Sequence, residues 1–256
     1  MKSIYFTPES QMPKGSGFQM YGPQHLLMLG ILGLWTAAVL LWLRRQSRAQ
    51  QNRVMRVTAG VMLGMEVLKD FLLGCIGAFS IGYLPLHLCS IAMFVCLYQG
   101  AHPNSKACGQ ILYSVCFPGA MCALLFPDWT MFPLLHFQSL HSFVYHTLLV
   151  QMSLAPLVTG RIRPGVRQVP LSMGFLVAVS IPVGMLNGWL HTNYMFLRRP
   201  SSGSPLELLG ALPGRYGYIM GYFLLVLGVV TAMNLPFSLS RWLRRCRTGG
   251  SAQNDM

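Results

Sequence analysis

The chain has 256 residues, of which 53% are hydrophobic and only 10% are charged, and its mean hydropathy is +0.48. Soluble domains carry about 25% charged residues, so a soluble protein of this composition could not cover its surface with polar side chains. The formal net charge is +13. Because the Lys and Arg residues lie between apolar runs and not on one face of a domain, this charge does not indicate nucleic-acid binding.

Seven mostly apolar segments have about the 20 residues that a helix needs to cross a bilayer. In chain order they are residues 24–43, 57–79, 84–101, 107–126, 136–158, 169–190 and 216–237. The sequence therefore predicts an all-α fold, a polytopic membrane bundle of about seven transmembrane helices formed by residues 24–238. An extracytoplasmic segment, residues 1–23, precedes this single domain, and a basic cytoplasmic tail, residues 239–256, follows it.

The distribution of basic residues predicts the orientation, because cytoplasmic loops are enriched in Lys and Arg. Thirteen lie in the first, third and fifth loops and the C-terminal tail: Arg44, Arg45, Arg48, Arg53, Arg56, Lys106, Arg161, Arg163, Arg167, Arg241, Arg244, Arg245 and Arg247. Five lie on the other side: Lys2, Lys14, Arg198, Arg199 and Arg215. We therefore expect a multi-pass protein of the cell membrane with its N-terminus outside and its C-terminus in the cytoplasm. Its expected partners are membrane lipids, and the sequence leaves the oligomeric state open.

Polar side chains inside the spans gather in the outer half of the bilayer under this topology. Polar groups at membrane depth are costly and often functional. The set comprises His25, Asp70, His87, Cys89, His141, His146, Asn187 and Asn193, and Glu66 lies four residues before Asp70 in the second span. Their common depth predicts a polar pocket that opens toward the outer leaflet.

Cys89 is the candidate nucleophile of this pocket. A thiol attacks as a thiolate and needs a nearby base or a positive environment. His87 lies two residues away, about 200° around a helix, so we expect the base to come from another span. Depth favours His141 on the fifth span, whereas helix tilt would favour His146. The alternative is that Cys89 packs as a small buried hydrophobe and that the histidines join helices through hydrogen bonds.

The other polar groups also have structural interpretations. Glu66, Lys69 and Asp70 are spaced at i, i+3 and i+4, which predicts a local ion pair, with an ion or proton pathway as the alternative. Asn187 and Asn193 are candidate oxyanion donors or helix-end caps. Because successive histidines of the fifth span lie five residues apart and share no helical face, we expect no metal site, and we expect no cofactor.

Three stretches carry a resemblance to a known family. They are LPLHLCSI at residues 84–91, HSFVYHTLLVQMSL at 141–154 and NYMFLRRPSSGSPLELLG at 193–210. Together with His25 they resemble the YwaF-like integral membrane proteins of bacteria, a family related to eukaryotic transmembrane protein 164. The resemblance extends from about residue 21 to residue 237.

The resemblance implies a multi-span helical fold and, by analogy with the eukaryotic relative, acyl transfer between phospholipids through an acyl-cysteine. It assigns Cys89 as the acyl acceptor and His146 as the base. This chain has Ser90 where many relatives have Asp. A phospholipid acyltransferase is therefore the leading functional hypothesis. The alternative is a non-enzymatic transporter or small-ligand receptor in which Glu66, Asp70 and the histidines line a path.

Overall fold

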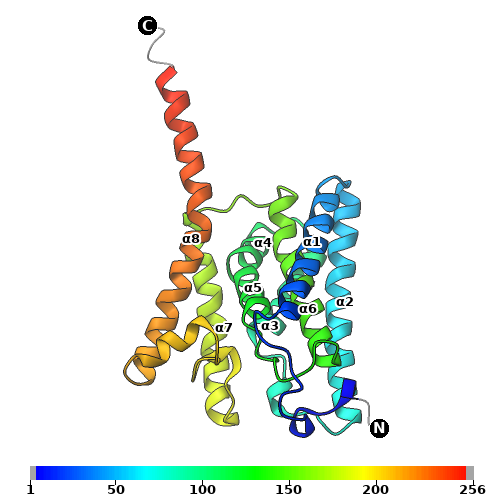
Figure 1. Ribbon diagram of the computed structural model, residues 1–256. Coiled ribbons are helices and arrows are strands. Elements are labelled where there is room, and N and C mark those ends of the chain that lie inside the picture. The colour runs from blue at the N-terminus through cyan, green and yellow to red at the C-terminus, as the bar shows by residue number, and fades with distance from the viewer. Residues whose placement is uncertain (1–3, 252–256) are drawn as a thin grey trace.

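Figure 1 shows a computed structural model of the protein, which describes residues 4–251. Every regular element within these residues is helical, as predicted. The α-helices are α1 (Pro23–Arg44), α2 (Arg48–Cys75), α3 (Leu88–Ala101), α4 (Lys106–Ile111), α5 (Phe117–Leu125), α6 (Phe137–Val158), α7 (Val169–Leu190) and α8 (Gly214–Ser251). A π-helical turn, η4 (Leu112–Cys116), joins α4 to α5. Short 3-10 turns are η1 (Ile4–Phe6), η2 (Glu9–Gln11), η3 (Ile81–Tyr83), η5 (Val166–Gln168), η6 (Tyr194–Phe196) and η7 (Pro205–Ala211).

Five helical segments of the described chain are long and apolar enough to cross a membrane. They are Pro23–Arg44, Ile81–Ala101, Lys106–Leu125, Val166–Leu190 and Gly214–Arg244. Two other long helices, α2 and α6, do not meet this hydropathy criterion, since α2 carries an ion-paired cluster and α6 carries several polar residues. Most residues of α6 are buried in protein, where polar side chains are tolerated. The chain is therefore a helical membrane protein, and a count of seven spans stays a prediction.

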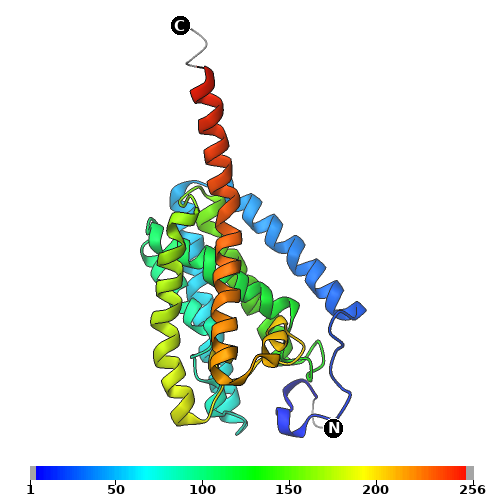
Figure 2. The same cartoon turned by 90° about the vertical axis from the view of Figure 1, so that its left-hand side faces the viewer.

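Helix α6 is the centre of the larger group of helices, because it packs against α1, α2, α3 and α5. Helices α7 and α8 pack on one another beside this group (Figures 1 and 2). The N-terminal segment lies at one end of the bundle, and α8 projects beyond the opposite end (Figure 1). The loops that join successive helices alternate between these two ends.

Several helix boundaries differ from the prediction, among them the end of α2, which lies at Cys75 and not at residue 79. Helix α2 begins at Arg48, nine residues earlier than expected, because Ser47 and Gln50 form a capping box at its start. Helix α3 begins only at Leu88, since Pro85 disfavours a helical conformation at the residue before it. Helix α8 continues to Ser251 through most of the predicted tail. The last part of that tail, residues 252–256, and residues 1–3 of the N-terminal segment lie outside the described residues.

The π-helical turn η4 has a local cause in the sequence. Pro118 lacks an N–H, so it cannot complete the helical ladder at the start of α5. The preceding residue, Phe117, donates its N–H to the carbonyl of Leu112, five residues back. The wider turn keeps the fourth predicted span continuous from α4 to α5 and places Ser114 and Gln110 on a buried face.

Asn234 fastens α8 to the rest of the bundle. Its Oδ1 accepts hydrogen bonds from Gln110 Nε2 (2.9 Å) and from the Gly165 amide (3.0 Å). Its Nδ2 donates to the Ser114 hydroxyl (2.9 Å) and to the Val230 carbonyl (2.8 Å). Hydrogen-bonding side chains join helices in membranes because an unpaired polar group in an apolar interior is costly.

Replacing Asn234 with leucine should lower the melting temperature of the detergent-solubilised protein. The change leaves buried donors on Gln110 and Gly165 unpaired, at about 1–3 kcal/mol each. The exposed amide of Gln19 offers a matched control, and Gln19→Leu should leave the melting temperature unchanged. Equal melting temperatures for the two variants would show that the network does not hold α8.

Candidate active site

Cys89 is the second residue of α3, and His87 is the N-cap residue of this helix. Its side chain is half-buried and packs against the main hydrophobic core. The amide N–H groups of Leu88, Cys89 and Ser90 donate to no other described residue, as expected in the first turn of a helix. These groups and the helix dipole place partial positive charge at the start of α3, whereas the Glu66 carboxylate acts on Cys89 with negative charge.

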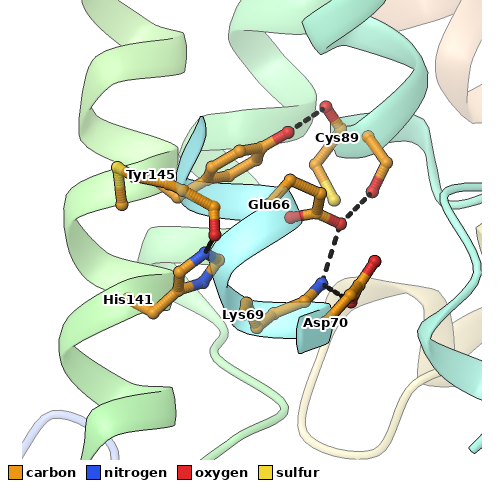
Figure 3. Close-up of polar contacts among 8 residues, drawn as sticks. Glu66, Lys69, Asp70, Cys89, His141 and Tyr145 are labelled. Carbon is orange, nitrogen blue, oxygen red and sulfur yellow. Dashed lines mark hydrogen bonds and ion pairs between the residues drawn. The ribbon is translucent and has the colours of Figure 1, made fainter. Parts of the chain in front are cut away.

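A charged cluster on α2 faces the start of α3 (Figure 3). Lys69 Nζ lies 2.7 Å from Glu66 Oε1 and 3.3 Å from Asp70 Oδ1, so the predicted local ion pair is confirmed. The Ser90 hydroxyl donates to Glu66 Oε1 at 3.3 Å. Figure 3 shows the Cys89 side chain on the side of α3 that faces Glu66. The residue next to Cys89 is thereby linked to a buried carboxylate of another helix.

Helix α6 contacts the same region through Tyr145 and His141. The Tyr145 hydroxyl donates to the Cys89 carbonyl at 3.3 Å. His141 Nε2 donates to the Met65 carbonyl of α2 at 3.2 Å, and its ring stacks on Tyr145 (Figure 3). His141 therefore joins α6 to the backbone of α2.

His146 lies one turn further along α6 and is 8% exposed. Its Nδ1 donates to the Ser142 carbonyl at 2.7 Å, so the neutral ring carries its lone pair on Nε2. The Trp129 ring stacks on it with centroids 5.3 Å apart. Glu66 interacts electrostatically with both His146 and Cys89. Within residues 4–251 no hydrogen bond joins the Cys89 sulfur to a histidine, and the pairing of Cys89 with His146 stays a prediction.

Asp128 lies in the loop between α5 and α6, next to Trp129. Its side chain reaches the surface, but protein atoms crowd around it. Crowding by these atoms partly desolvates the Asp128 carboxyl and raises its pKa, and the nearby His146 ring opposes the rise. The loop thus contributes an aromatic ring and a carboxylate to the surroundings of His146.

Three other predicted site residues have structural contacts that use their polar groups. His25 is fully buried; its Nδ1 accepts from the Tyr21 amide and its Nε2 donates to the Leu124 carbonyl, both at 3.0 Å. Asn187 binds the amide and the carbonyl of Tyr194 (2.8 and 2.9 Å). Asn193 accepts from the amides of residues 198 and 199. These contacts favour the capping interpretation of the two asparagines over a role as oxyanion donors.

His87 connects the start of α3 to the loop after α7. Its ring lies edge-on to Tyr194 at 5.3 Å and tilted against Phe196 at 5.8 Å. The Tyr194 hydroxyl donates to the Ile81 carbonyl just before α3. The loop that follows α7 therefore lies against the segment that leads to Cys89.

Sequence reasoning missed four residues of this site: Ser90, Tyr145, Asp128 and Trp129. In the sequence Ser90 stands out only as a departure from the family pattern, and Tyr145 lies among apolar residues of its span. Their contacts depend on how α2, α3 and α6 pack against one another. The spacing of residues along a single helix does not show this packing. A usable signal existed for Asp128, because it is one of only six acidic residues in the chain and follows a predicted span directly.

Comparison with the models of known protein families shows a relationship. The model of the TMEM164 family matches residues 20–234, which span the helical core from the start of α1 to Asn234. Searches among curated proteins and among solved structures gave no significant match. The matched segment covers most of the chain and includes all three stretches that carried the resemblance, so this chain belongs to the TMEM164 family.

Proposed function

We propose that the protein is an intramembrane phospholipid acyltransferase in which Cys89 is the nucleophile and His146 the base. One observation carries the proposal: Cys89 lies at the amino end of α3, Tyr145 of α6 donates to its carbonyl, and His146 follows Tyr145 directly in α6. Nucleophile, base and positively polarised amides are the three elements that acyl transfer requires. Membership of the TMEM164 family supports a membrane location for this chemistry.

The reaction has two balanced steps. His146 takes the thiol proton, and the thiolate attacks the ester carbonyl of a phospholipid. The tetrahedral intermediate collapses to a Cys89 thioester, and the imidazolium protonates the departing lysophospholipid oxygen. In the second step a lysophospholipid hydroxyl gives its proton to His146 and attacks the thioester, which releases the new phospholipid and restores the thiol.

The amides of Cys89 and Ser90 are the proposed oxyanion donors. The negative oxygen of each intermediate forms next to the sulfur, and these N–H groups lie at that position in the first turn of α3. They replace Asn187 and Asn193, whose side chains are engaged with backbone groups. Ser90 and Glu66 position this turn against α2.

We further propose seven membrane passes with the N-terminus outside and the C-terminus cytoplasmic. The opposite placement of the N-terminal segment and the end of α8 supports an odd number of passes (Figure 1). Helices α2 and α6 have 28 and 22 residues, enough to span the bilayer. Labelling of single cysteines engineered into the loops at either end, in sealed vesicles, tests this topology.

The proposed function is tested by the acylation state of the thiol. Purified protein in nanodiscs is incubated with a phospholipid that carries a labelled acyl chain, and its intact mass is then measured. A covalent adduct on Cys89 that neutral hydroxylamine removes is the expected result, because hydroxylamine cleaves thioesters. A Cys89 that stays unmodified under turnover conditions would contradict the proposal.

Replacing His146 with glutamine should slow thioester formation by about 10²–10⁴-fold, the usual contribution of a general base. His141→Gln is the matched variant, since it removes a histidine of the same helix that is bonded to the α2 backbone. It should slow the reaction far less. Single-turnover labelling kinetics measure both rates, and a slower reaction for the His141 variant would reverse the assignment.

A further inference from the structure

An open cavity of about 390 Å³ lies at the end of α7, in the loop that follows this helix. Its lining residues are His191, Thr192, Asn193, Arg198 and Arg199. Neither arginine forms an ion pair with a carboxylate in the described part of the chain. The only acidic residue between α7 and α8 is Glu207, and its oxygens accept from Ser202 and Gly203. The cavity is therefore lined by positive charge without an internal counter-charge.

The loop around this cavity is held in an unusual conformation. His191, Met195 and Phe196 have positive φ angles of 53–55°, which non-glycine residues rarely adopt. Two asparagine side chains hold this backbone in place. Asn187 accepts a hydrogen bond from the Tyr194 amide, and Asn193 donates one to the Arg199 carbonyl. Such strain persists where surrounding contacts impose it, and it is concentrated at functional sites. The backbone that presents the two arginines is thus preorganised.

The two guanidinium groups differ in their engagement. Arg198 donates through one terminal nitrogen to the Asn187 carbonyl at 2.9 Å. The Arg199 side chain donates no hydrogen bond to another described residue, and it is exposed. Guanidinium groups match the oxygens of phosphate in a bidentate geometry. The free donors at the cavity are therefore suited to a phosphate group.

The position of the loop favours a phosphate at the membrane surface. Trp189, 75% exposed, lies at the end of α7 and is typical of residues at the bilayer interface. Tyr194 and Phe196, from the same loop, contact His87 beside the start of α3. A ligand whose phosphate occupies the cavity therefore lies at the end of the bundle where α3 begins and where Cys89 is located.

We propose that the cavity formed by His191, Thr192, Asn193, Arg198 and Arg199 binds the phosphate group of an anionic ligand. We assign the cavity as the headgroup subsite of the phospholipid substrate, an assignment that rests on the proposed acyl transfer. A lipid headgroup and free inorganic phosphate present the same chemistry, and the test separates them.

The test compares phosphatidylglycerol with diacylglycerol of the same acyl chains, which lacks the phosphate. Native mass spectrometry of the detergent-purified protein measures how much of each lipid binds, and inorganic phosphate is added as a competitor. Wild type should prefer phosphatidylglycerol. Arg199→Gln should weaken that binding about tenfold, as expected for loss of one charge-assisted contact. Arg199→Lys, which keeps the charge but not the fork, should lie between them.

Arg215→Gln is the matched control, because Arg215 is exposed at the start of α8 and does not line the cavity. It should bind phosphatidylglycerol within twofold of wild type. Displacement by millimolar inorganic phosphate would identify a site that accepts free phosphate, and resistance to it would identify the lipid headgroup as the source. Both outcomes support the phosphate site. Equal binding of the two lipids without any binding of phosphate, or unchanged binding by Arg199→Gln, would overturn it.

The binding measurement is repeated on Cys89→Ser, which cannot form a thioester. Retained preference for the phosphate-bearing lipid there shows a binding site independent of the chemistry. A thioester in wild type together with no effect of Arg199→Gln on lipid binding would reject the headgroup subsite alone. A phosphate preference without any thioester would reject the acyl transfer alone.

Discussion

Cys89→Ser should abolish the hydroxylamine-sensitive acyl label and lower acyl transfer by at least about 10³-fold. Removal of a catalytic nucleophile has effects of this order, because a serine hydroxyl is far less nucleophilic than a thiolate when no stronger base activates it. The substitution exchanges sulfur for oxygen at a half-buried position, and its amide remains in the first turn of α3. Loss of activity in a correctly folded variant therefore reports on the sulfur itself.

Cys75→Ser supplies the control for adventitious acylation. Cys75 is the last residue of α2, is exposed and is a free thiol. An activated acyl donor that reacts without catalysis would label this cysteine. We expect Cys75→Ser to keep the label and the activity of wild type, while Cys89→Ser loses both. A label that persists in Cys89→Ser and disappears in Cys75→Ser would eliminate the nucleophile assignment.

The membrane fold could be predicted from the long apolar runs, because a run of about 20 apolar residues is typical of a helix that crosses a bilayer. The boundaries of α7 match the prediction at both ends, and α6 begins one residue later than predicted. The predictions were poorer where a local signal was overlooked. The capping pair Ser47 and Gln50 starts α2 within a predicted loop. Pro85 moves the start of α3 to a later residue than predicted. Both signals are visible in the printed sequence.

The candidate site was predicted only in part, for a physical reason. Helix spacing was sufficient for the Glu66–Lys69 ion pair, because both partners lie on one helix. The contact of Ser90 with Glu66 and that of Tyr145 with the Cys89 carbonyl join different helices. Their register depends on the packing of whole helices, which spacing along one chain segment does not determine. His25 fits the alternative interpretation of the span histidines, since both of its ring nitrogens form hydrogen bonds to backbone groups.

Lys69→Met should destabilise the protein strongly, by about 3–5 kcal/mol, the usual effect of removing one partner of a buried ion pair. Lys69 and Glu66 are 9% and 6% exposed, and Lys69 also contacts Asp70. Without the ammonium group, two neighbouring carboxylates repel each other in a region of low dielectric constant. Melting temperature and the monodisperse fraction after detergent extraction measure the effect. Lys106→Met, at an exposed position, should leave both unchanged.

The double variant Glu66→Gln/Lys69→Met decides whether uncompensated charge is the cause. It removes the buried carboxylate together with its partner, so it should recover part of the stability that Lys69→Met loses. Glu66 also accepts from Ser90, and the glutamine keeps an acceptor oxygen for this hydroxyl. If the double variant is as unstable as Lys69→Met, the lost packing of the lysine stem is responsible. The ion pair would then not be what holds α2 against the start of α3, and Glu66 would lose its assigned part in positioning Cys89.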